Sequence, residues 1–128
     1  MSKDLKRIET ALRKRALGYP EVTEDFPWGH RALKVKGKAF LFLSLEKGEL
    51  SFSVKLPASG AAALTLPFTE PTHYGLGKHG WVTATLREGK KVPPLELFAG
   101  WVEESYRSIA PKTVVRKLDG ASGASKLK

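Results

Sequence analysis

The sequence contains no cysteine among its 128 residues. This absence excludes disulfide bonds, thiolate zinc sites, iron–sulfur clusters and a cysteine nucleophile. No apolar run approaches the roughly 18 residues that a membrane-spanning helix needs. Residues 1–17 are charged throughout and lack the apolar stretch of a secretory signal. Together these absences predict a soluble, cytoplasmic protein.

The chain carries a strong excess of positive charge. It has 22 Lys and Arg residues against 13 Asp and Glu residues, which gives a net charge of +9. The excess is concentrated in residues 1–17, 30–55, 78–92 and 112–128. Such a surplus attracts polyanions, of which nucleic acid is the most common and a membrane surface the next. A soluble domain that merely has a high isoelectric point would show the same charge, so charge alone leaves both interpretations open.

The hydrophobic pattern changes from a helical period to a period of two and back again. The first predicted element is a helix that Ser2 caps and that Gly18 and Pro20 end, and an acidic link follows it. Three strands are then predicted over 31–36, 39–45 and 50–56, followed by a short Ala-rich helix within 57–66 and an ordered or mobile loop over 67–80. The last predicted elements are a strand over 81–87 and a long helix that starts at Pro93–Pro94 and is interrupted by Pro111. The strand over 39–45 is apolar at nearly every position, which predicts that both of its faces are covered.

Strands that follow one another through short turns form an antiparallel meander. The N- and C-terminal helices are both amphipathic, so they can cover one face of that sheet. The predicted fold class is therefore α+β, with a single domain over residues 1–118. Residues 119–128 consist mainly of Gly, Ser, Ala and Lys, which predicts a disordered basic tail.

Several short strings, taken together and in order, resemble one family of proteins. They are EDFPWG at residues 24–29, VKGKAF at 35–40, VKLP at 54–57, YGLGKHGWV at 74–82, ESYR at 104–107 and APK at 110–112. The chain resembles the MmcQ/YjbR-like family of small bacterial proteins over about Leu5 to Leu118. The resemblance implies an α+β sandwich related to the frataxin-like shape and sometimes called a double wing. It also implies a DNA-binding protein, and it supplies no catalytic residues.

Basic side chains on the predicted strands form the main candidate site. Since the apolar residues fix the inward face, the alternating lysines point away from it. Basic hairpins of this kind can straddle a phosphate backbone without reading sequence, and their binding should depend strongly on salt. The candidate nucleic-acid-binding residues are Lys34, Lys36, Lys38, Lys55, Lys78, Trp81, Arg87, Lys90 and Lys91. The alternative is a solvated strand face that its lysines protect against edge pairing.

A glycine-rich loop provides a second candidate. Its glycines lead into a strand and not into a helix, which excludes a dinucleotide-binding loop. An anion nest remains, in which free backbone N–H groups lie beside basic side chains. Its residues are Gly75, Gly77, Lys78, His79 and Gly80. The alternative is a turn that allows Trp81 to pack.

A different class of function, a small-ligand or protein-interaction module, would use a pocket built from Trp28, Tyr74, His79 and Trp81. Aromatic residues in so small a domain are more often part of the core or its rim. A deep apolar cleft at the glycine-rich loop would favour this alternative over nucleic-acid binding.

Catalysis has little support in the sequence. The imidazoles are His30, His73 and His79, and no two of them have the spacing of a metal pair on a helix. Glu24, Asp25 and His30 could form an acid–base cluster, but no nucleophile motif accompanies them, and a solvated acidic turn explains the carboxylates better. We therefore expect no catalytic residue, no metal, no cofactor and no enzymatic activity. Nucleic acid, DNA in the first place, is the expected partner.

Overall fold

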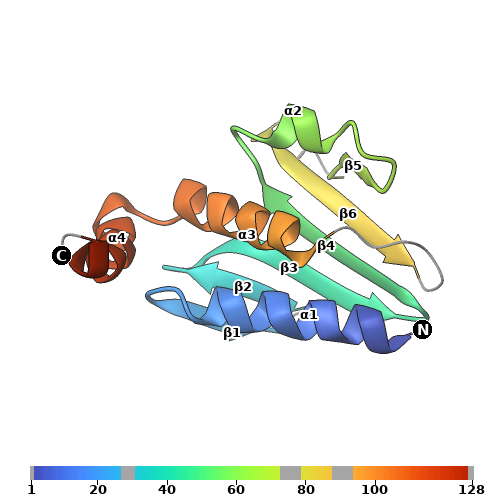
Figure 1. Cartoon of the computed structure of the whole chain (residues 1–128), viewed down its shortest axis with the longest axis horizontal. Helices are drawn as coiled ribbons and strands as arrows, with labels where there is room; N and C mark the ends of the chain where they lie inside the picture. The colour runs from blue at the N-terminus through green and yellow to red at the C-terminus, as the bar shows by residue number, and fades with distance from the viewer. Residues whose placement is uncertain (1, 27–30, 73–78, 88–93, 127–128) are drawn as a thin grey trace.

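The computed structural model describes residues 2–26, 31–72, 79–87 and 94–126, the segments 2–4 and 120–126 by their backbone alone. Its elements are the helix α1 (Ser2–Leu17), the strands β1 (Val22–Asp25), β2 (Arg31–Val35), β3 (Lys38–Glu46) and β4 (Glu49–Lys55), the short helix α2 (Gly60–Ala63), the strands β5 (Thr69–Pro71) and β6 (Trp81–Arg87), and the helices α3 (Leu95–Ile109) and α4 (Lys112–Lys126). The predicted α+β class is confirmed. Figure 1 shows the arrangement of these elements along the chain.

The six strands of the described residues form one antiparallel sheet in the order β1-β2-β3-β4-β6-β5. The four long strands are those that the sequence predicts. The two edge strands were missed, because β1 lies in the segment expected to be an acidic link and β5 in the segment expected to be a loop. Both are short, and β5 contains Pro71, which an edge strand tolerates. Pairing with a long neighbour, and not local propensity, makes these segments strands.

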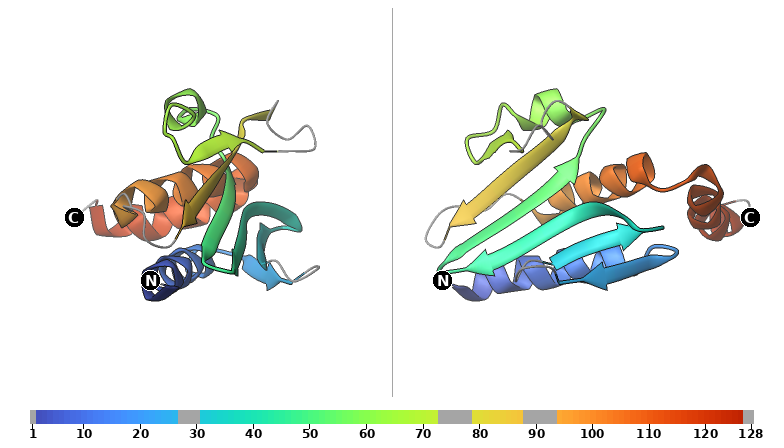
Figure 2. Two further views of the ribbon diagram at one scale, coloured as in Figure 1. Left: turned by 90° about the vertical axis from the view of Figure 1, so that its right-hand side faces the viewer. Right: turned by 180° about the vertical axis from the view of Figure 1, so that it is seen from behind.

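The helices α1 and α3 cover one face of the sheet, as the meander with two terminal helices predicts (Figure 2). The residues Leu5, Ile8, Leu12 and Ala16 of α1 are all buried, and so is the α3 stripe around Phe98, Val102 and Tyr106. They pack on the alternate side chains of the four long strands. Burial of these apolar surfaces is the main term that stabilises the fold.

The strand β3 contains a bulge that the helix α3 stabilises. In the register with β2, Leu33 pairs with Leu41 and Lys34 with Ala39, so Phe40 has no partner there. Phe40 and Leu41 both lie in the core. The hydroxyl of the fully buried Ser105 donates to the Phe40 carbonyl and accepts from the Lys55 amide at 2.8 Å. This hydroxyl satisfies two backbone groups and attaches α3 to the ends of two strands.

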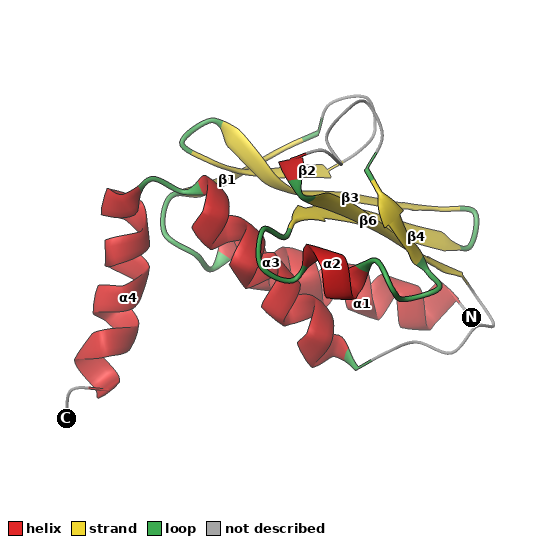
Figure 3. Cartoon of the chain, turned by 90° about the horizontal axis from the view of Figure 1, so that it is seen from above, coloured by secondary structure: helices red, strands yellow, loops and turns green. Residues whose placement is uncertain are grey.

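The opposite face of the sheet has no described helix over it, and Figure 3 shows α1, α2 and α3 on the same side. We call this the open face. Its side chains on β3, β4 and β6 are Phe42 and Ser44, then Ser51, Ser53 and Lys55, then Trp81, Thr83, Thr85 and Arg87. The strand β3 was expected to be covered on both faces. Within the described residues it has helices over one face alone, and Phe42 on its other face is partly buried against Trp81. Its open-face positions are Phe42 and Ser44, and the nearly continuous apolar run results partly from the bulge at Phe40.

The last helix, α4, extends to Lys126. The sequence predicts a disordered tail over residues 119–128, whereas the backbone is helical from Lys112 to Lys126. The alanines and lysines of the tail favour a helix, while each glycine costs only about 1 kcal/mol relative to alanine. Figures 1 and 3 show that α4 stands beyond the end of the sheet.

Within the described parts of the chain, the helices fall short of the length and apolarity needed to cross a bilayer.

Candidate nucleic-acid interface

Four predicted lysines gather at one end of the sheet, where β2 turns into β3 and where β4 ends. Lys36 occupies the turn with a φ of 52°, followed by Gly37 with a φ of 82°. This pair of positive φ angles forms a tight two-residue hairpin turn. Lys38 opens β3 opposite Val35, whose side chain is buried in the core, so the expectation that Lys38 points away from the helix-covered side was wrong. Lys55 ends β4 opposite Trp81, on the open face. We call Lys34, Lys36, Lys38 and Lys55 the basic end.

Two of these four lysines bind carboxylates. Lys34 Nζ lies 3.1 Å from Asp25 Oδ2, and its hydrogen bond holds the pKa of Asp25 below the ordinary value. Lys36 Nζ lies 2.8 Å from Glu21 Oε1. Lys38 is exposed and Lys55 half-buried, and neither has a carboxylate partner among the residues that the structure describes. The basic end therefore combines two paired and two unpaired ammonium groups.

Arg87 lies at the other end of the open face, which we call the hairpin end. Its Nε donates to Glu49 Oε2 at 2.7 Å, and Glu49 itself pairs across the hairpin with Glu46. The strand β4 separates Glu49 from Lys55 by about 20 Å at the usual rise per residue. Lys78, Lys90 and Lys91 lie outside the described residues. The described cations of the predicted set thus divide between two ends of the sheet.

Trp81 lies on the open face but is only 7% exposed. Its ring packs against Phe42 on β3, with the centroids 5.6 Å apart. Next to this pair, the hydroxyls of Ser53 and Thr83 lie 2.8 Å apart, and that of Thr72 lies 2.9 Å from Thr83. Trp81 therefore contributes mainly packing beside Lys55 and offers little ring surface to a ligand.

The predicted anion nest is described only at its end. Gly75, Gly77 and Lys78 lie outside the described residues, while His79 is exposed. Gly80 has a φ of +88°, a conformation that favours glycine, and its carbonyl accepts a 2.8 Å hydrogen bond from the Leu56 amide. Gly80 thus connects the start of β6 to the end of β4, which agrees with a structural turn.

Of the predicted ligand pocket, Trp28 and Tyr74 lie outside the described residues, as do His30 and His73. No cluster of three metal-ligating side chains occurs within the described parts of the chain. A groove of about 610 Å³ lies elsewhere, between α3 and the segment before α2. Its residues are Pro57, Ala58, Gly100, Glu103, Glu104, Arg107 and Ser108. Glu104 accepts from the amides of Ala58 and Ser59, so it positions the backbone there.

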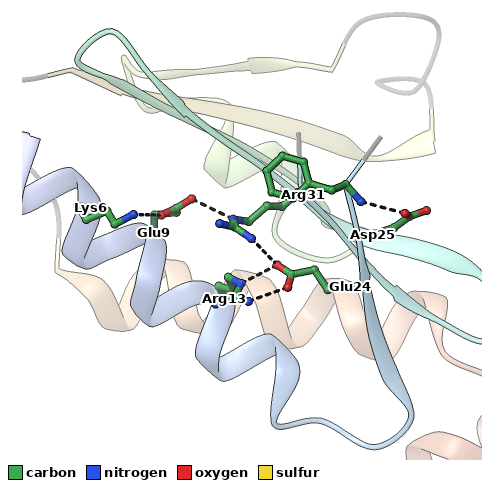
Figure 4. A network of polar contacts seen from close by, with 7 residues as sticks. Lys6, Glu9, Arg13, Glu24, Asp25 and Arg31 are labelled. Carbon is green, nitrogen blue, oxygen red and sulfur yellow. Dashed lines mark hydrogen bonds and ion pairs between the residues drawn. The ribbon is translucent and has the colours of Figure 1, made fainter. Parts of the chain in front are cut away.

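The acidic link that the sequence indicated is part of an ion-pair network between α1, β1 and β2 (Figure 4). Glu24 accepts two hydrogen bonds from Arg13, at 2.6 and 2.7 Å, and one from Arg31 at 3.0 Å. Arg31 also donates to the buried Glu9 at 3.3 Å. The hydrogen bond from Arg13 opposes burial and lowers the pKa of Glu24. Glu24 therefore joins elements of the fold instead of forming the solvated turn that we expected.

Sequence reasoning missed one cation at the basic end. Lys117 on α4 also donates to Glu21, the carboxylate that binds Lys36. Lys117 and Glu21 are 96 positions apart in the chain, so no local pattern could have indicated the contact between them.

Comparisons with known proteins agree with this fold. The YjbR family model matches residues 17–108. No curated protein matches the chain. A structural-genomics crystal structure of a protein from Pseudomonas syringae is similar in fold, with a TM-score of 0.56 and 16% sequence identity over 82% of this chain and 97% of that chain. The match covers all six described strands and nearly all of α3, and this chain belongs to the YjbR family.

Proposed function

We propose that this protein is a non-enzymatic nucleic-acid-binding protein that contacts the phosphates of DNA with little sequence specificity. The observation that carries the proposal is the position of Lys38 and Lys55. They come from different strands, lie at the same end of the sheet, and have no carboxylate partner within the described residues. Lys34 and Lys36 lie beside them.

The chemistry of the basic end suits phosphate better than base edges. Its cations are lysines, whose ammonium groups act as flexible point charges and not as the planar forks that read guanine. Neighbouring strands are about 4.8 Å apart, so Lys34 on β2 and Lys55 on β4 stand about 10 Å from each other across the sheet. Two such groups can reach separate phosphates of one backbone. Contacts of this kind position a protein on DNA without specifying sequence.

The hairpin end is unsuited to the same role. Glu46 and Glu49 face each other there, and Arg87 is engaged by Glu49. A polyanion would be repelled by these carboxylates, so the proposed path crosses the sheet at the basic end instead of running along the strands.

The experiment is a fluorescence anisotropy titration of labelled duplex and single-stranded DNA at salt concentrations between about 50 and 200 mM. The double variant Lys38→Gln/Lys55→Gln removes two charges from the basic end, and Lys47→Gln/Arg87→Gln removes two from the hairpin end. We expect the first to reduce the slope of log affinity against log salt on duplex DNA by about 1.8, at about 0.9 for each lost phosphate contact. The second should leave the slope close to that of the wild type.

A matched pair of single variants tests the same point with one charge. Lys36 and Lys47 occupy equivalent turns, each followed by glycine, with φ angles of 52° and 51°. Lys36→Gln should weaken binding more than Lys47→Gln. Equal effects would show that only net charge matters. No binding of the wild type to either DNA at micromolar protein in low salt would overturn the proposal.

A further inference from the structure

A single carboxylate bridges two lysines at the basic end. Glu21 binds Lys36 Nζ through Oε1 at 2.8 Å and Lys117 Nζ through Oε2. One lysine belongs to the β2–β3 turn and the other to α4, so an anionic group holds two distant segments together. Two ammonium groups around one anion leave a net positive charge at this point.

The position of α4 is fixed by further contacts at its N-terminal half. Val114 is fully buried, and Val115 and Leu118 pack against the core. Arg107 at the end of α3 binds Asp119 at 2.8 Å and Glu103 at 3.0 Å. These contacts place Lys117 at the end of the sheet, where it binds Glu21. The helix lies outside residues 17–108, the part that matches the family.

The exposed side of α4 is also basic. Lys112 and Arg116 are exposed, and within the described part of the chain neither has an ionic partner. They stand four residues apart, which places them on one side of the helix. Their side is roughly opposite Val114 and Leu118, so it faces away from the core.

We propose that α4 is part of the nucleic-acid interface and that Glu21 occupies, between Lys36 and Lys117, the place that a backbone phosphate takes in the complex. This inference rests on the proposed function. It adds α4 as a second element that contacts DNA, and Glu21 as an anion of the protein itself that competes with the phosphate. A carboxylate and a phosphate both accept hydrogen bonds from ammonium groups through anionic oxygens. The same two lysines can therefore exchange one anion for the other.

The surroundings of Glu21 permit that exchange. The residue lies at the surface, where ion pairs contribute little stability, so losing them costs the fold little. Its neighbour Pro20 is held independently, because the Tyr106 hydroxyl donates to the Pro20 carbonyl at 2.8 Å. Hydrogen bonds from Lys117 and Lys36 lower the pKa of Glu21 to about 2, so the competing carboxylate is ionised at neutral pH. Displacement by DNA thus replaces one full negative charge by another.

The test compares two carboxylates, one at each end of the sheet, that both bind basic side chains. Glu21→Gln frees Lys36 and Lys117, whereas Glu49→Gln frees Arg87, and both raise the net charge by the same amount. With labelled duplex DNA, we expect Glu21→Gln to bind about threefold to tenfold more tightly than the wild type, and Glu49→Gln less than about twofold. Lys117→Gln should weaken binding and lower the salt slope by about 0.9, while Lys47→Gln should not.

Thermal unfolding of each variant provides the control for folding. Equal gains for Glu21→Gln and Glu49→Gln would overturn the inference, as would equal effects of Lys117→Gln and Lys47→Gln. If those results accompany the expected loss in Lys38→Gln/Lys55→Gln, the inference fails while the proposed function stands. If the wild type binds no DNA, both fail.

Discussion

The two faces of the sheet differ in what covers them and in what they contribute. One face packs its leucines, valines and phenylalanines against α1 and α3 and forms the core. The open face carries hydroxyls, one aromatic pair, and the side chains of Lys34 and Lys55. The difference predicts that stability depends mainly on the covered face and the proposed DNA binding on exposed lysines outside the core. Substitutions on the helix-covered face should act on folding, and those on the open face on binding.

The two ends of the open face differ in charge. The basic end has lysines on the β2–β3 hairpin and at the end of β4, whereas the hairpin end has Glu46 opposite Glu49. Both ends contain the same Lys-Gly turn, so local sequence does not distinguish them. The surrounding carboxylates do, and they make the basic end the better surface for a polyanion.

The largest effect should come from truncating the core. Phe98 is fully buried against Phe52, Phe68 and Trp101, so Phe98→Ala should cost about 3–5 kcal/mol of unfolding free energy in urea titrations. Phe42→Ala, a similar truncation on the open face, should cost clearly less because Phe42 is only partly buried. Equal losses would show that the open face is as important for stability as the covered one.

The next largest effect should come from the hydroxyl at the bulge. Ser105→Ala leaves the Phe40 carbonyl and the Lys55 amide without this partner, which should cost about 1–3 kcal/mol. Ser108→Ala on the same helix removes an exposed hydroxyl and should change stability by less than about 0.5 kcal/mol. Chemical denaturation of both variants measures the difference. A neutral Ser105→Ala would contradict the role assigned to the bulge contact.

A smaller effect, dependent on pH, is expected at Glu104. Burial alone would raise its pKa, but hydrogen bonds from Ser59 and Ala58 hold the pKa below the ordinary 4.5. Since the folded pKa is the lower one, the stabilisation is present above pH 4.5 and is lost as the pH falls through the folded value. Glu104→Gln should therefore be destabilised by about 1 kcal/mol at neutral pH.

Urea titrations of the wild type and Glu104→Gln at a series of pH values measure that contribution. The two stability curves should converge as the pH decreases below 4.5. A constant gap at every pH would indicate that Gln disturbs packing and that the ionised carboxylate has no special role.

The smallest effect on stability should come from the basic end. Lys38→Gln and Lys55→Gln should each change unfolding free energy by less than about 0.5 kcal/mol, because neither lysine has a carboxylate partner in the described residues. The same variants should weaken DNA binding. A large loss of stability in either would contradict the separation between the residues that stabilise the fold and those proposed to bind DNA.

The sequence predicted the long elements because each has a clear hydrophobic period. It could not predict β1 and β5, which owe their strand conformation to neighbours distant in the chain. The period of two also showed that Lys34 and Lys55 point away from the core, and the register agrees. The resemblance to the family, read from short strings of the same residues, is confirmed over residues 17–108.

Local sequence patterns could not predict which of the candidate lysines lie close together in the structure. Whether Lys55 lies near Lys38 or near Arg87 depends on where the hairpins end, and this follows only from the pairing. The ion pair between Lys117 and Glu21 depends on the angle at which α4 leaves α3. The bulge at Phe40 likewise depends on Ser105, which is 65 residues away.

The most direct measurement is a map of backbone amide chemical shifts during titration with duplex DNA at low salt. We predict that the perturbed amides cluster at Lys34–Lys38 and Lys55, on β2, the β2–β3 turn and the end of β4. The amides of Glu46–Glu49 at the opposite hairpin should remain unchanged. Perturbations centred on that hairpin, or none at any DNA concentration, would contradict the assignment of nucleic-acid binding to the basic end.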